Sequence, residues 1–316
     1  MKGRTETVTK EKRETGITAS SGKRSGVEVM EPVRWTAPVV FASPHSGRRY
    51  PSRFVEQSRL SARDLRRSED AFVDEVFAMA PDFGAPLIKA HFPRAYVDAN
   101  RNAYELDPAM FRDALPDHVI TKSPRITAGL GTVPKIVASG ENIYDGKLAY
   151  EEARDRIETH YEPYHQALSG LVSEAVERFG GCLLIDCHSM PSFGTDGKRR
   201  KTAPVPDMVL GDCHGRSCAR EVVAIAENIL EESGFHTVRN KPYAGGFTAR
   251  HYGKPRGGVH VLQVEINRAI YMDEKKIARG PGLATLVNKM SRVIEVLAGI
   301  EPVLLGGDSR FLKAAE

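Results

Sequence analysis

The sequence predicts a mixed α/β protein built around a largely parallel sheet. Short apolar runs alternate along the chain with longer segments in which apolar residues recur every three to four positions. Several of the short runs contain almost no polar residue, which is typical of strands that helices cover on both faces. The length of 316 residues is also ordinary for one α/β domain with a substantial core.

Each predicted element rests on its local pattern. Strands are expected at residues 37–42, 87–92, 95–97, 182–186, 207–211, 236–239 and 259–266. Helices are expected at residues 62–80, 148–179, 216–233 and 279–297. The second of these helices should be broken or kinked at Pro163. The stretch 101–143 is rich in Pro, Gly and Asp, so we expect a long irregular segment, a kind of loop that is often functional.

The N-terminal segment and the composition exclude several classes of protein. From Met1 to Gly26, seven Lys or Arg and three Glu stand among small polar residues, so residues 1–26 should form a disordered basic tail. Residues 27–316 are expected to form a single domain. No apolar stretch has the length of a membrane span or a secretory signal, which predicts a cytoplasmic protein without a membrane partner. The tail lacks aromatic residues, so we expect no nucleic-acid partner. The oligomeric state is not indicated.

Two histidines come directly after apolar runs that are far apart in the sequence. His45 follows the run 39–42 within Ser-Pro-His-Ser-Gly, and His188 follows the run 182–185 within Asp-Cys-His-Ser. Because the carboxyl ends of parallel strands meet at one edge of a sheet, both imidazoles are expected there. A single histidine at such a place is more often a hydrogen-bonded structural residue, whereas two together indicate a divalent metal such as zinc.

A catalytic zinc ion takes three protein ligands and leaves one position for water. The nearest carboxylates that could supply the third ligand are Glu69 and Asp70, in the helix predicted after His45. The alternative is that both residues belong to the solvated, charged face of that helix.

Glu265 lies inside the apolar run 261–266, where a carboxylate is costly unless it is paired or neutral. Burial would raise its pKa toward the range of a general base, which could take a proton from water and deliver it to a leaving nitrogen. The alternative is a structural ion pair with Arg268 or another arginine.

Arg94, Asn100 and Arg101 are close together in the sequence and could bind a carboxylate or an oxyanion. The same residues would also suit an exposed, charged turn. The Gly-Gly pair at 245–246, followed by Arg250, would allow a ligand to approach the backbone, or it could form a flexible hairpin.

Ordered motifs resemble those of the N-formylglutamate amidohydrolase family, within the wider zinc carboxypeptidase-like group that includes aspartoacylase and succinylglutamate desuccinylase. The matching stretches are Ser-Pro-His-Ser-Gly (43–47), Asp-Ala-Asn-Arg (98–101), Ile-Tyr-Asp (143–145), Pro-Tyr-His (163–165), Asp-Cys-His-Ser (186–189), Asn-Lys-Pro-Tyr-Ala-Gly-Gly (240–246), Gln-Val-Glu-Ile-Asn-Arg (263–268) and Tyr-Met-Asp-Glu (271–274). The resemblance implies a three-layer α/β/α sandwich with a mixed, mostly parallel sheet.

The resemblance also implies roles for individual residues. It makes His45 and His188 metal ligands, Glu265 the catalytic glutamate, Asn100 and Arg101 the pair that holds a substrate carboxylate, and Arg94 the oxyanion-stabilising arginine. The chain departs from the His-x-x-Glu pattern of carboxypeptidase-like sites, since Arg48 stands three residues after His45. Asp70, ahead of Glu69, is therefore expected to be the carboxylate ligand.

The implied reaction is the zinc-dependent hydrolysis of N-formyl-L-glutamate to formate and L-glutamate, a step of histidine degradation. The partner would be a small molecule with carboxylates, and Arg250 would help to bind it. Two alternatives stay open at this point. One is a deacylase or carboxypeptidase for another N-acyl acidic amino acid, and the other is a non-catalytic binding protein for acidic amino acids.

Overall fold

The computed structural model describes residues 26–192 and 205–306, and the chain divides into two compact units. The first unit comprises Met1–Glu28, His45–Glu69 and Ala90–His165, and the second comprises Val29–Pro44, Asp70–Lys89 and Gln166–Glu316. The basic tail predicted at residues 1–26 lies outside the described residues except for Gly26. That residues 27–316 form a single domain stays a prediction.

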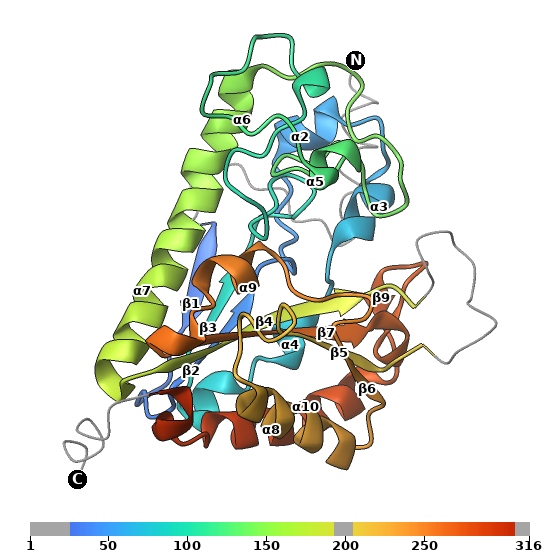
Figure 1. Ribbon diagram of the computed structural model, residues 1–316. Helices are drawn as coiled ribbons and strands as arrows, with labels where there is room; N and C mark the ends of the chain where they lie inside the picture. Colours follow the sequence, from blue (N-terminus) through green and yellow to red (C-terminus); the bar gives the residue numbers. More distant parts are fainter. Residues whose placement is uncertain (1–25, 193–204, 307–316) are drawn as a thin grey trace. The chain divides into compact units, whose positions relative to one another are not determined.

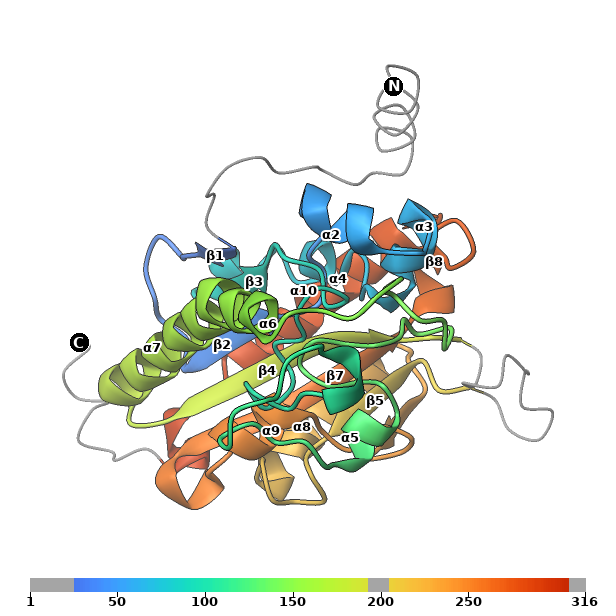
Figure 2. The ribbon, with the colours of Figure 1, turned by 90° about the horizontal axis from the view of Figure 1, so that it is seen from above.

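A seven-stranded sheet runs in the order β1-β3-β2-β4-β7-β5-β6. Its strands are β1 (Val27–Met30), β2 (Val39–Ser43), β3 (Leu87–Ala90), β4 (Cys182–Met190), β5 (Met208–Gly211), β6 (Thr237–Arg239) and β7 (Val259–Asn267). The pairings β2–β3, β2–β4, β4–β7 and β5–β6 are parallel, whereas β5 and β7 are antiparallel. Figure 2 shows β2, β4, β7 and β5 side by side. The predicted mixed, mostly parallel sheet is therefore confirmed. The short strands β8 (Met272–Asp273) and β9 (Ala278–Arg279) pair separately.

Helices cover this sheet on both faces. In Figure 1, α8 (Arg220–Glu232) and α10 (Leu283–Ala298) lie below the strands, and α9 (Phe247–Tyr252) lies above them. The sequence of α10 explains its placement, because its buried residues recur every three to four positions along one side. These residues are Leu283, Leu286, Met290, Val293, Ile294 and Leu297. The helices predicted at 216–233 and 279–297 are confirmed within a few residues at each end.

The helix predicted at 148–179 forms with an irregularity near its middle. It consists of α6 (Tyr150–Arg156), one turn of π-helix, η4 (Ile157–Tyr161), and α7 (Glu162–Phe179). Pro163 lies just after the π turn. Since proline cannot donate a backbone hydrogen bond, a wider turn before it lets the helix continue. The irregularity therefore lies just before Pro163, the residue at which the sequence predicted a break or kink.

The helix predicted at 62–80 is wrong, because the segment folds as several short turns. These are α3 (Ala62–Leu65), η1 (Arg66–Ser68), α4 (Val73–Val76) and η2 (Ala80–Phe83). Phe72 has a left-handed backbone with φ of 67°, which a regular helix cannot contain. Glu69 and Asp70 lie between the turns and are 3% and 1% exposed, so they are not on a solvated helix face.

The first unit has little regular structure. Its remaining elements are α2 (Ser52–Gln57), η3 (Pro108–Met110) and α5 (Pro124–Thr127). The irregular stretch predicted at 101–143 contains only η3 and α5 among these elements. The strand predicted at 95–97 is wrong, because the amides of Tyr96 and Val97 both donate to the Pro93 carbonyl and close a turn.

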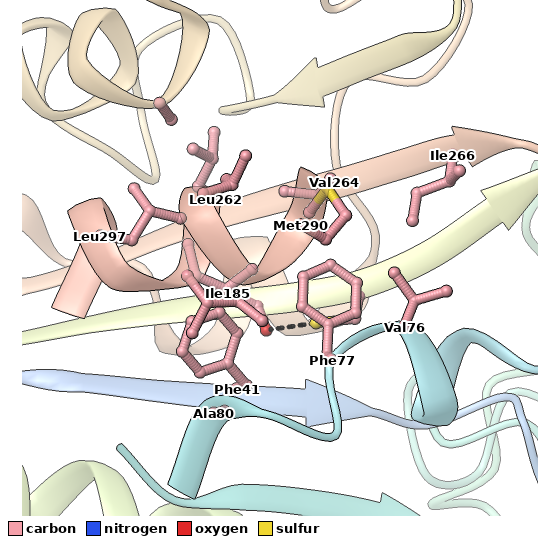
Figure 3. Packing of buried hydrophobic residues seen from close by; sticks show 14 of the residues in the cluster. Phe41, Val76, Phe77, Ala80, Ile185, Leu262, Val264, Ile266, Met290 and Leu297 are labelled. Atoms are coloured by element: carbon pink, nitrogen blue, oxygen red, sulfur yellow. Dashed lines mark hydrogen bonds between the residues drawn. The ribbon is translucent and has the colours of Figure 1, made fainter. Parts of the chain in front are cut away.

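The core of the second unit lies between the sheet and α4, η2, α8 and α10. Figure 3 shows Phe77 against Phe41, with Ile185, Val264 and Met290 nearby. The rings of Phe41 and Phe77 have centroids 5.8 Å apart, and both side chains are fully buried. Among the described residues, no helix is long and apolar enough to cross a membrane.

Phe77→Ala should lower the free energy of unfolding by about 3–5 kcal/mol, because the cavity it leaves cannot fully collapse. Met79→Ala is the matched control, since Met79 is 37% exposed and its loss should cost less than about 0.5 kcal/mol. Urea unfolding followed by circular dichroism measures both values. Equal stability of the two variants would contradict this account of the core.

Candidate functional site

The pairing of β4 with β7 places four polar side chains on one face of the sheet. In this parallel register, Asp186 is opposite Gln263 and His188 is opposite Glu265. Residues two apart on a strand point to the same face, so these four side chains lie together. All are buried, from Asp186 at 0% to Glu265 at 7% exposure. The burial expected for Glu265 is therefore confirmed, and polar groups surround it.

His188 has a carboxylate at each of its two ring nitrogens. Nδ1 is 3.0 Å from Oδ2 of Asp70, and Nε2 is 3.0 Å from Oδ2 of Asp186. A neutral imidazole carries one N–H, so both contacts can be favourable only if a second proton or a cation is present. Burial lowers the pKa of His188, but Asp186 and the hydrogen bond to Asp70 outweigh it and raise the pKa well above its usual value. This donor set fits a metal ion at Nδ1, with Asp186 accepting a hydrogen bond from Nε2 and so fixing the orientation of the ring.

Asp70 and Glu69 have different partners although they are adjacent in sequence. Oδ1 of Asp70 accepts a 2.8 Å hydrogen bond from Nη2 of Arg268, while its other oxygen faces His188. Arg268 also donates to Oγ of Ser189 at 3.1 Å. Arg268 therefore holds Asp70, and an ion pair of Glu265 with Arg268 or another arginine stays an untested alternative.

Glu69 is held by residues of the first unit. Its carboxylate accepts two hydrogen bonds from Nε and Nη2 of Arg66, at 3.0 Å each, and one from the Tyr50 hydroxyl at 2.8 Å. Burial raises the pKa of Glu69, and the charge of Arg66 opposes that shift. These contacts satisfy the Glu69 carboxylate, whereas Asp70 faces a predicted metal ligand, which supports the choice of Asp70 over Glu69.

Asp98 contacts all four predicted site residues that belong to the first unit. Its Oδ1 lies 2.7 Å from Nε2 of His45 and accepts a 2.8 Å hydrogen bond from the backbone amide of Asn100. Its Oδ2 accepts a 3.0 Å hydrogen bond from Nη2 of Arg94 and lies 3.4 Å from Nη2 of Arg101. Burial by itself raises the pKa of Asp98, but Arg101, His45 and Arg94 outweigh it and hold the pKa well below its usual value. Sequence reasoning missed Asp98, although it stands at the start of the Asp-Ala-Asn-Arg motif.

Two guanidinium groups, those of Arg94 and Arg101, contact this carboxylate, and Arg125 lies near Arg101. Burial lowers the pKa of Arg101 to about 10; Asp98 opposes the shift, while the like charges of Arg94 and Arg125 add to it. Arg125 lies on α5 and was also missed, since no motif marks it in the sequence. Positive charge concentrated in this way favours the binding of anions, and anion binding by Arg94 and Arg101 stays a prediction.

The broken helix α6–η4–α7 supports the loop 96–101 that carries this cluster. Backbone carbonyls of the loop accept hydrogen bonds from Arg156 Nη1 at 3.3 Å, Tyr161 Oη at 2.8 Å and His165 Nε2 at 2.8 Å. The guanidinium of Arg156 also lies 4.3 Å from the ring centroid of Tyr96. The π turn between Arg156 and Tyr161 contains one residue more than a turn of α-helix. The side chains after it therefore point in a different direction than they would in a regular helix.

Arg250 is exposed on α9 and donates to the Gly245 carbonyl at 3.1 Å. The structure therefore ties it to the Gly-Gly loop before its own helix. Its predicted contact with a substrate carboxylate stays a prediction.

Asp98→Asn should destabilise the protein by about 3–5 kcal/mol near neutral pH, because Arg94 and Arg101 lose a buried partner. The folded-state pKa of Asp98 is lowered, so its contribution exists above the unfolded value of about 3.9 and is lost as the pH falls toward the folded pKa. Urea unfolding at a series of pH values should show that the difference in free energy of unfolding between the variant and the wild type becomes smaller in acid. The exposed Asp117→Asn is the control, and a difference that does not change with pH would contradict the assignment.

The chain is similar to known proteins over most of its length. Residues 37–272 match the family model described as N-formylglutamate amidohydrolase. An N-formylglutamate deformylase of Pseudomonas putida is 29% identical over 243 residues, covering 75% of this chain and 82% of that protein. One from Pseudomonas aeruginosa is 28% identical over 254 residues, covering 78% of this chain and 87% of that protein.

A solved structure agrees with these sequence relatives. The crystal structure of N-formylglutamate amidohydrolase from Ralstonia eutropha JMP134 superposes with a TM-score of 0.82 at 34% identity, covering 87% of this chain and 98% of that one. The family inferred from the motifs and the fold that it implies are thereby confirmed. The chain belongs to the N-formylglutamate amidohydrolase family.

Proposed function

We propose that this protein is a metal-dependent amidohydrolase that cleaves N-formyl-L-glutamate to formate and L-glutamate. Family membership supports an amide hydrolase, and the relatives from both Pseudomonas species are named for this substrate. The observation that carries the metal dependence is His188, whose two nitrogens both face carboxylates. A cytoplasmic location and a place in histidine degradation belong to the same proposal.

The proposed ligands of one zinc ion are His45, Asp70 and His188. Asp70 and His188 of the second unit face each other at 3.0 Å, and His45 of the first unit is the third proposed ligand. Each histidine turns Nε2 toward a buried carboxylate, Asp98 or Asp186, as metal-bound imidazoles commonly do. When bound, zinc would polarise the formyl carbonyl and lower the pKa of a water molecule.

Glu265 is the proposed general base. It would take the proton of the attacking water and deliver it to the leaving nitrogen, which becomes the amine of glutamate. Its burial beside His188 and its hydrogen bond to Gln263 support this role, because a base needs a fixed orientation as well as a suitable pKa.

The guanidinium cluster of the first unit is proposed to bind the charged parts of the substrate. Asn100 and Arg101 would hold a carboxylate, and Arg94 would stabilise the oxyanion that forms as water adds to the formyl carbon. Arg125 adds positive charge to the same cluster, and Arg250 is proposed as a further carboxylate ligand. A substrate with two carboxylates matches this excess of positive charge.

Hydrolysis of N-formyl-, N-acetyl- and N-succinyl-L-glutamate by the purified protein tests the function directly. The formyl compound should give the highest kcat/KM. Preference for another acyl group would make the protein a deacylase of different specificity. Failure to cleave any of the three, with binding of glutamate retained, would favour the non-catalytic binding protein.

Glu265→Gln should keep its zinc but lose about 10²–10⁴-fold in kcat, because an amide cannot accept the water proton. Steady-state kinetics and elemental analysis of the same preparation give both values. Near-normal turnover would remove Glu265 from the proposed mechanism.

His188→Ala should lose stoichiometric zinc, since one of three ligands and the partner of Asp70 disappear together. Metal content is measured by elemental analysis after dialysis. His118→Ala, at an exposed position, is the control and should keep its metal. Stoichiometric zinc in the His188 variant would show that the proposed ligand set is incorrect.

A further inference from the structure

The side-chain amide of Gln263 bridges a backbone amide and the proposed base. The amide of Gly246 donates to Oε1 of Gln263 at 2.7 Å, and Nε2 of Gln263 donates to Oε1 of Glu265 at 2.8 Å. A backbone N–H can only donate, so the oxygen of Gln263 must face Gly246 and its NH₂ group must face Glu265. The chemistry of the neighbours thus fixes the orientation of this amide.

Burial makes this bridge restrictive. Gln263 is 4% exposed and Glu265 is 7% exposed, and both project from the same face of β7. Rotating either side chain would leave a buried polar group without its partner, which is unfavourable. The bridge engages Oε1 of Glu265 and thereby fixes the plane and direction of the carboxylate.

The backbone that anchors Gln263 is itself closely packed. The Cys213 amide donates to the Ala244 carbonyl at 2.6 Å, and Arg250 donates to the Gly245 carbonyl. A Cβ at Gly211 would lie 2.8 Å from the Gly245 nitrogen, and a Cβ at Gly245 would lie 2.6 Å from Cys213 Sγ. Gly245 also has φ of +126°, which favours glycine. The loop 244–246 is therefore held from both sides at distances that side chains would not allow.

We propose that Gln263 is a positioning residue that holds the Glu265 carboxylate in the orientation required for proton transfer, with the loop 244–246 as its fixed anchor. This inference rests on the proposed function, in which Glu265 is the base. Proton transfer is sensitive to the placement of the base, and a displacement of about 1 Å can cost about 10²-fold in rate. In this arrangement Arg250 contributes by holding the anchor loop.

Gln263→Met tests the proposal, because methionine is similar in length but has no amide. The kcat for N-formyl-L-glutamate should fall about 10–100-fold, while KM, zinc content and glutarate affinity measured by calorimetry stay near wild type. Gln57→Met is the matched control. Gln57 likewise donates to a glutamate, Glu152, at 2.8 Å, and it lies outside the proposed site, so its kcat should not change.

A double-mutant cycle with Glu265→Gln separates positioning from a general effect on folding. If Gln263 acts through Glu265, adding Gln263→Met to the Glu265→Gln variant should change the residual kcat by less than about 2-fold. An equal loss in both backgrounds would overturn the proposal, as would a normal kcat in the single variant. Wild-type turnover is measured first: no hydrolysis of any of the three acyl-glutamates would refute the proposed function and this role with it. If another acyl-glutamate is the substrate, the cycle is run with that compound.

Discussion

The parallel pairing of β4 with β7 places a row of polar side chains inside an otherwise apolar sheet. Asp186 and His188 on one strand stand opposite Gln263 and Glu265 on the other. A shift of one residue would turn every member of this row to the opposite face, which is lined by the apolar core. The apolar neighbours on the alternate positions, such as Ile185 and Val264, lie in that core. The same alternation therefore fixes the strand register and orients the candidate active site.

Buried charged side chains in both units are stabilised by direct contacts with other side chains. Asp98 joins His45 to Arg94 and Arg101 in the first unit, and Asp70 joins His188 to Arg268 in the second. Each carboxylate thus contacts a proposed metal ligand on one side and a guanidinium on the other. Such networks favour one arrangement of their members, because breaking any contact leaves a buried charge uncompensated. Within each unit, these contacts hold the candidate side chains in a fixed arrangement before any ligand binds.

The fold was largely predictable because strands and helices of the second unit have strong local patterns. The long apolar runs of β4 and β7 and the periodic apolar residues of α8 and α10 formed as expected. The prediction failed at 62–80 and 95–97, where apolar spacing suggested regular elements. There the backbone follows specific contacts, such as the ion pair of Arg66 with Glu69 and the hydrogen bonds from the amides of residues 96 and 97 to the Pro93 carbonyl. Contacts of this kind leave no periodic pattern in the sequence.

The sequence by itself determined the fold class, the family and the residue types at the ends of the key strands, because these depend on periodicity and on short ordered motifs. Only the tertiary structure showed that Asp70 and Glu69 have different partners, because the positions of distant side chains cannot be read from two adjacent carboxylates in a sequence. It also revealed that Asp98 and Arg125 belong to the charged cluster of Arg94 and Arg101, and that Gln263 donates a hydrogen bond to Glu265. These roles depend on distances between side chains, and the chain brings those side chains together only when it folds.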